Sequence, residues 1–90
     1  MSEKKLRFTG LLSKNRQGQI WVQDPFSGNY HELDEVGGSI CTLLKVPKTQ
    51  EELIAALTEE YEVDAAQCRR DIAPFLQKLL DSGLVKEENA

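Results

Sequence analysis

Apolar residues change their spacing along this chain at Leu33–Asp34. In the few residues just before that point, apolar and polar residues alternate, as in a half-buried strand, and after it apolar residues recur at helical spacing. Strands followed by helices predict an α+β fold rather than alternating β–α units. The join is unusual because Gly37 and Gly38 stand where the first helix should begin. We interpret them as positions where that helix packs closely against its neighbours.

Three strands are predicted in the first part of the chain, over residues 6–14, 19–23 and 29–33. Two short segments separate them, and both contain residues that are typical of tight turns: Asn and Gly in residues 15–18, and Asp, Pro and Gly in residues 24–28. Strands joined by short turns pair antiparallel. The sequence therefore predicts an N-terminal three-stranded antiparallel sheet.

Three helices are predicted in the second part of the chain, over residues 35–44, 50–61 and 65–82. Each follows a residue that can cap the helix backbone, namely Asp34, Thr49 and Asp64. Glu52 and Gln67 stand three residues after the second and third caps, which is the spacing of a capping box. These caps indicate where each helix begins, to within a few residues.

Pro74 lies inside the third predicted helix. An interior proline removes one backbone hydrogen bond and costs roughly 3 kcal/mol. Because the apolar spacing continues through Pro74, we expect a kink in one helix rather than two separate helices.

Composition limits the classes of function. The chain has 90 residues, which predicts a single domain over residues 1–90, and its net charge of −4 disfavours binding to nucleic acid. Its longest apolar runs are a few residues, so no segment is expected to enter a membrane. The N-terminal MSEKK lacks the apolar part of a signal peptide, which favours the cytoplasm.

The sequence offers few residues that could support catalysis. The chain has one histidine, two cysteines and no glycine-rich phosphate loop, so neither an enzyme, a metal site nor a cofactor is predicted. Cys41 and Cys68 fall on the apolar faces of predicted helices, and the simplest interpretation is that both are reduced core residues.

The order of elements is that of a winged helix-turn-helix, with the sheet ahead of the helices. A DNA-binding winged helix and a structural module that forms a homodimer through an open strand edge are therefore alternatives. The leading hypothesis is peptide binding, because a three-stranded sheet has open edges that an extended peptide can complete. A peptide on the third strand would lie in a trough beside the third helix. Two interpretations of Arg69 and Arg70 near this trough are open, namely contact with acidic residues of the peptide or ordinary solvated charge.

The chain resembles the PqqD-like family, the recognition domains for precursor peptides of ribosomally made, modified natural products. The resemblance runs from about Arg7 to Val85 and is strongest in YHELDEVGGSICTLL and in KTQEELIAALTEEYEVDAAQCRRDIAPFLQKLLDSGLV. It rests on the order and spacing of the Leu-Asp, Gly-Gly, Thr-x-Glu-Glu-Leu, Tyr-x-Val-Asp and Gly-Leu-Val pieces. These pieces are mostly core and cap residues, so their combination carries more weight than any one of them.

The resemblance implies a non-catalytic carrier. In the family, the leader part of a precursor peptide adds as a strand to the third strand and packs on the third helix. The domain then presents the peptide to a modifying enzyme, such as a radical SAM enzyme, or to a leader peptidase. Carried to this chain, the implied peptide-binding residues are Asn29, Tyr30, His31, Glu32 and Leu33 of the strand, and Arg69, Ile72, Ala73 and Leu76 of the helix.

Overall fold

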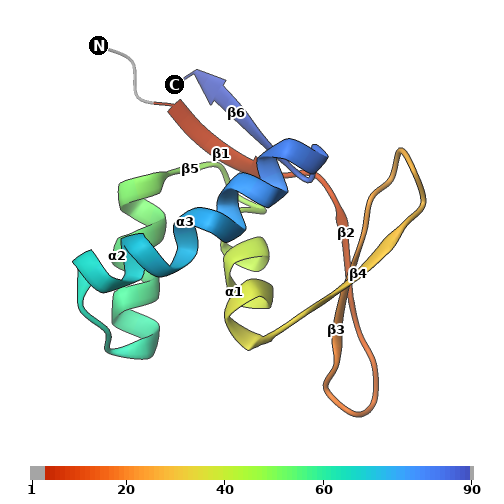
Figure 1. Ribbon diagram of the computed structural model, residues 1–90, viewed down its shortest axis with the longest axis horizontal. Helices are drawn as coiled ribbons and strands as arrows, with labels where there is room; N and C mark the ends of the chain where they lie inside the picture. Colours follow the sequence, from red (N-terminus) through yellow and green to blue (C-terminus); the bar gives the residue numbers. More distant parts are fainter. Residues whose placement is uncertain (1–3, 90) are drawn as a thin grey trace.

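The computed structural model describes residues 4–89 and has an α+β architecture, as predicted (Figure 1). The first half of the chain contains the strands β1 (Lys4–Phe8), β2 (Leu11–Lys14), β3 (Ile20–Gln23) and β4 (Tyr30–Leu33). The second half contains α1 (Glu35–Leu43), β5 (Lys48–Thr49), α2 (Gln50–Tyr61), α3 (Ala65–Ser82) and β6 (Val85–Asn89). None of the helices in this described range is long and apolar enough to cross a membrane.

The predicted three-stranded antiparallel sheet is formed by β2, β3 and β4, in that order. Its central strand β3 pairs on one side with β2 and on the other with β4, so both outer strands keep a free edge. Figure 1 shows this sheet extending away from the helices on the side opposite α2. Its inner face contributes Val22, which is fully buried, to the core.

The prediction of one strand over residues 6–14 is wrong, because the chain breaks at Thr9–Gly10 and changes sheets there. The Thr9 N–H donates to the Leu84 carbonyl at 2.8 Å, and its hydroxyl donates to the Gly83 carbonyl at 2.8 Å. A side chain on Gly10 would come within 2.8 Å of Leu84, so only glycine fits here without rearrangement. The segment before the break is β1, and the segment after it is β2.

A second sheet, in the order β5-β1-β6, was not predicted. Strand β6 comes from the acidic C-terminal segment and pairs antiparallel with β1, from Lys4 opposite Asn89 to Phe8 opposite Val85. Lys4 pairs with Glu87 at 3.2 Å, and Arg7 forms an ion pair with Glu88. The two ends of the described chain therefore lie side by side (Figure 1).

The helices begin at the predicted caps. The Gly37 N–H donates to the Asp34 carboxylate at 2.7 Å, and Thr49 forms the complete capping box with Glu52. Asp64 caps α3 by accepting from the Gln67 N–H at 3.1 Å. The second capping box is incomplete, however, because the Gln67 side chain donates forward along the helix to Asp71 at 2.8 Å. Helix α3 runs through Pro74 as one helix and ends at Gly83, whose φ of 81° is left-handed.

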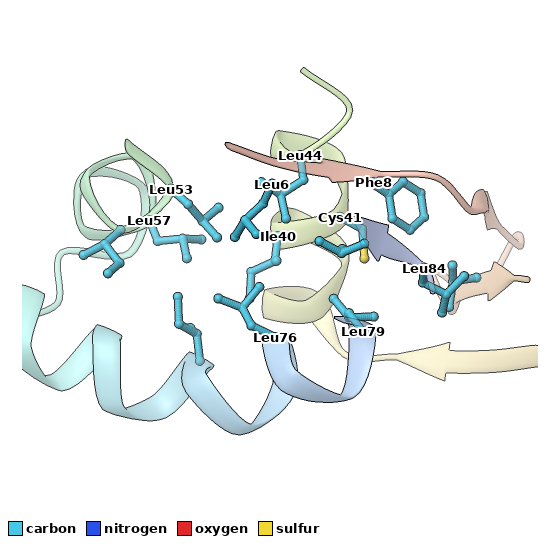
Figure 2. Close-up of a cluster of buried hydrophobic side chains, with 14 of the residues drawn as sticks. Leu6, Phe8, Ile40, Cys41, Leu44, Leu53, Leu57, Leu76, Leu79 and Leu84 are labelled. Carbon is cyan, nitrogen blue, oxygen red and sulfur yellow. The ribbon is translucent and has the colours of Figure 1, made fainter. Parts of the chain in front are cut away.

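One core joins both sheets to the three helices (Figure 2). Cys41 and Cys68 are free and buried within it, as predicted. Burial raises the pKa of the Cys41 thiol to about 12, so this side chain behaves as a small apolar residue. The most completely buried side chains are Val22, Ile40, Cys41, Leu44, Leu53, Leu57 and Val85.

Candidate functional site

The free edge of β4 presents unpaired backbone groups. The Asp24 N–H donates to the Asn29 carbonyl at 3.0 Å, and the register then runs from Gln23 opposite Tyr30 to Ile20 opposite Leu33. Because antiparallel pairs alternate between bonded and non-bonded, Tyr30 and Glu32 direct their N–H and C=O groups away from β3. These two residues can therefore bond to another extended chain.

A groove lies between this edge and α3, with a volume of about 420 Å³. We call it the β4–α3 groove. Its apolar lining from the core includes Leu79 and Leu84, which Figure 2 shows at one end of the buried cluster. The full lining is Val22, His31, Glu32, Leu33, Asp34, Phe75, Lys78, Leu79, Ser82 and Leu84.

Two glycines set the distance between the groove and the start of α1. A side chain on Gly37 would lie 3.1 Å from the Phe75 ring, and one on Gly38 would lie 2.6 Å from the end of Ile20. Both glycines are buried. They let the first turn of α1 pack against α3 and against β3, as the sequence predicted, and so position Phe75 beside Leu33.

The groove carries charges of both signs. Lys78 supplies positive charge, whereas Glu32 and Asp34 supply negative charge. The Asp34 carboxylate is occupied by the cap of α1. Among the described residues, the ion pairs join glutamates to Lys4, Arg7 and Arg69, so Lys78 keeps its charge available to a ligand.

The turn before β4 is held by its own polar groups. The Asp24 carboxylate accepts from the Phe26 N–H at 2.9 Å, and this hydrogen bond holds the pKa of Asp24 below its usual value. The Gly28 N–H donates back to the Asp24 carbonyl at 2.8 Å, where the φ of Gly28 is 76°. The start of the candidate edge is thus fixed in place before any ligand arrives.

The structure brings together three of the five predicted strand residues at the groove, namely His31, Glu32 and Leu33. The Tyr30 side chain is 62% exposed and does not line the groove, although its backbone belongs to the free edge. Asn29 lies in the turn, where its carbonyl accepts from Asp24. The strand part of the predicted site is therefore contiguous, with Asn29 at its border.

The four predicted residues of α3 do not line the groove. Ile72 and Leu76 are buried in the core, each only 4% exposed. Ala73 is exposed and borders a different hollow, together with Leu76 and the start of β1. Arg69 turns toward α2, where its guanidinium donates to Glu51 at 2.9 Å. This ion pair lowers the pKa of Glu51.

Another face of α3 lines the groove, formed by Phe75, Lys78, Leu79 and Ser82. These positions follow the i, i+3, i+4, i+7 spacing of one helical face. Sequence periodicity could identify this face as a candidate, since Phe75 and Leu79 belong to the predicted apolar stripe. It could not decide which edge of the stripe borders β4, because that depends on how α3 crosses the sheet.

Among residues 4–89, no three His, Cys, Asp or Glu side chains come together as a metal ion would require. What the site offers is a strand edge, an apolar groove and a few charges. This arrangement suits an extended peptide, because backbone bonds supply affinity and alternate side chains can enter the groove.

Comparisons with known proteins point to one family. The sequence profile described as coenzyme PQQ synthesis protein D (PqqD) matches residues 19–85. Among solved structures, TbiB1 in complex with the TbiA(beta) leader peptide is 28% identical to this chain and superposes with a TM-score of 0.75, covering 89% of this chain and 94% of that one. A search of curated proteins gave no match. The chain belongs to the PqqD family, as its sequence resemblance predicted.

Proposed function

We propose that this chain binds the leader region of a ribosomally made precursor peptide as a strand added to β4. The free edge of β4 beside the β4–α3 groove is the observation that carries this proposal. The similar structure of TbiB1, which was solved with a leader peptide, supports the class of ligand.

The alternation of β4 sets the register of an added antiparallel strand. Leader residues opposite Tyr30 and Glu32 exchange backbone hydrogen bonds with them. Leader residues opposite His31 and Leu33 direct their side chains to the groove face, where Phe75 and Leu79 provide apolar contacts. The leader should therefore carry apolar residues at alternate positions.

The proposed role of the chain is that of a non-catalytic carrier. By holding the leader, it raises the concentration of the attached peptide near a modifying enzyme or a leader peptidase to the order of millimolar, if the tether reaches. An unfolded leader loses conformational freedom on binding, so the groove contacts must offset that cost.

The test is to titrate the chain with the leader peptides encoded beside its gene and to follow its backbone amides by NMR. Shifts at residues 30–33 and on the Phe75–Ser82 face of α3 are expected. Glu32→Pro removes an outward N–H while leaving the β3 ladder intact, and should weaken leader binding by about tenfold or more.

Lys14→Pro is the matched control, because it removes an outward N–H from β2, the other edge of the same sheet. It should bind the leader with unchanged affinity. Equal affinity of Glu32→Pro and the wild type, or amide shifts confined to other parts of the molecule, would contradict strand addition at β4.

A further inference from the structure

The sheet that carries β4 has a second free edge at β2. The Asn15 N–H donates to the Gln19 carbonyl at 2.9 Å, and Lys14 is opposite Ile20 in the register. By the same alternation, Leu12 and Lys14 direct their N–H and C=O groups away from β3. No other backbone group among residues 4–89 bonds to them.

A hollow of about 470 Å³ lies beside this edge, between β2 and α1. We call it the β2–α1 groove. Its apolar part is formed by Leu12, Ile20 and Leu43. Two carboxylates line it from the helices, Glu35 at the start of α1 and Glu60 near the end of α2. Lys14 of the same copy lines it from β2, so the two carboxylates outnumber the one cation. The groove therefore suits an extended segment that carries both apolar and basic side chains.

Strand β2 itself has this chemistry, since its sequence is Leu-Leu-Ser-Lys. We infer that the occupant of the β2–α1 groove is a second copy of this chain, paired through β2. A two-fold axis at Ser13 places Leu12 of each copy opposite Lys14 of the other, and both residues have the outward backbone groups that such a pair needs.

Charge complementarity supports this pairing. Residues opposite each other in an antiparallel pair direct their side chains to the same face. Lys14 of one copy therefore reaches the groove side of the other, where Glu35 and Glu60 lie. Ser39 holds Glu60 in place by donating to its carboxylate at 3.3 Å. The two-fold axis repeats each of these contacts.

The inferred contact is independent of leader binding. It uses β2, which lies outside the family match at residues 19–85, and it leaves β4 free in both copies. Two strands of four residues bury less than the roughly 1,600 Å² of a standard interface, so the dimer should be weak. The result would be one six-stranded sheet, with the free edge of β4, where the leader is proposed to bind, at each end.

Sedimentation equilibrium of the full chain between about 10 µM and about 1 mM tests this inference. The average mass should rise from 10.2 kDa toward twice that value as concentration increases. Lys14→Pro should stay monomeric throughout, and Lys14→Glu should do the same because it sets like charges against Glu35 and Glu60. Added salt should weaken the wild-type association.

Glu32→Pro is the control at the other edge and should associate like the wild type. A wild type that stays at 10.2 kDa at the highest concentration would overturn the inference. Association lost in Glu32→Pro but kept in both Lys14 variants would place the contact on β4 and overturn it as well. Circular dichroism of each variant shows whether it is folded, and Lys14→Glu serves alone if the proline variant is not.

Discussion

The two sheets of this molecule use the same kind of strand for different purposes. In the β5-β1-β6 sheet, Leu6, Phe8 and Val85 are buried in the core, and ion pairs join β1 to β6. In the β2-β3-β4 sheet only Val22 is buried, and Leu11 and Tyr30 on the outer strands are largely exposed. The first sheet therefore forms part of the core, whereas the second leaves backbone groups and apolar side chains exposed, where a ligand can bind.

The outer strands differ in the same way. Strand β6 carries Lys86, Glu87 and Glu88 in succession, and charged residues on an edge discourage another chain from pairing there. Strand β4 carries Tyr30, a histidine, a single carboxylate and Leu33. Because charged residues protect the edge of β6 but not that of β4, a peptide is expected to add at β4.

Truncation of one aromatic side chain in each sheet tests this division most strongly. Phe8→Ala should lower the free energy of unfolding by about 3–5 kcal/mol, because Phe8 is only 7% exposed. Tyr30→Ala should change it by less than about 0.5 kcal/mol, since the Tyr30 side chain is exposed. Urea denaturation measures both, and equal losses would show that the second sheet is as structural as the first.

Gly10, where the chain passes from one sheet to the other, should be the next most sensitive position for the free energy of unfolding. A methyl group on Gly10 would meet Leu84, Phe8 and Val22 at 2.8, 2.9 and 3.0 Å. Gly10→Ala should therefore cost about 1–3 kcal/mol of unfolding free energy through overpacking. Gln17→Ala, in the exposed turn after β2, is the control and should be nearly neutral. An equally stable Gly10→Ala would show that the sheets can move apart at this point.

Acid should weaken the capping box of Thr49 and Glu52, where β5 runs into α2. The pKa of Glu52 is held below its ordinary value of 4.5 by hydrogen bonds from the Thr49 backbone and side chain. A carboxyl group whose pKa is lowered by folding stabilises the folded protein at pH values above its ordinary pKa. This stabilisation is lost as the pH falls through the lowered pKa of the folded state.

Glu52→Gln keeps an oxygen for the cap but does not titrate in this range, so its melting temperature should fall less than that of the wild type between about pH 5 and pH 3. Glu59→Gln, which removes an exposed carboxylate later in α2, is the matched control and should follow the wild type. Parallel pH curves for all three proteins would contradict a role for the cap in acid stability.

The smallest effect is expected from Arg69, the residue that the sequence placed in the peptide trough. Because its guanidinium is paired with Glu51 and lies outside the groove lining, Arg69→Glu should leave leader affinity nearly unchanged. Lys78→Glu reverses the charge of a groove residue and should alter affinity severalfold. Calorimetric titration with one leader compares the affinities of the two variants. A larger loss of affinity in Arg69→Glu than in Lys78→Glu would show that Arg69 belongs to the binding site.

The helices could be predicted closely because their ends are marked by local chemistry. Asp34, Thr49 and Asp64 each accept the hydrogen bond of a cap, and Gly83 adopts the left-handed conformation that ends α3. Such signals act over a few residues and can be read without knowing the rest of the fold.

The parts that escaped prediction depend on contacts between distant residues. The break at Gly10 is set by Leu84, which lies 74 positions along the chain, and β6 is a charged segment that pairs only because β1 is beside it. The groove-lining face of α3 likewise follows from how α3 crosses the sheet. Hydrophobic spacing identified its apolar stripe but could not orient that stripe relative to β4.

Pairing of β1 with β6 also has a consequence for the order of folding. The ladder runs from Lys4 opposite Asn89, so it closes a loop that includes nearly the whole chain. Hairpins and capped helices form early because their contacts are local, whereas this closure carries a larger entropic cost. During synthesis, Leu6 and Phe8 must wait for the residues of β6 to leave the ribosome before their strand is fully paired.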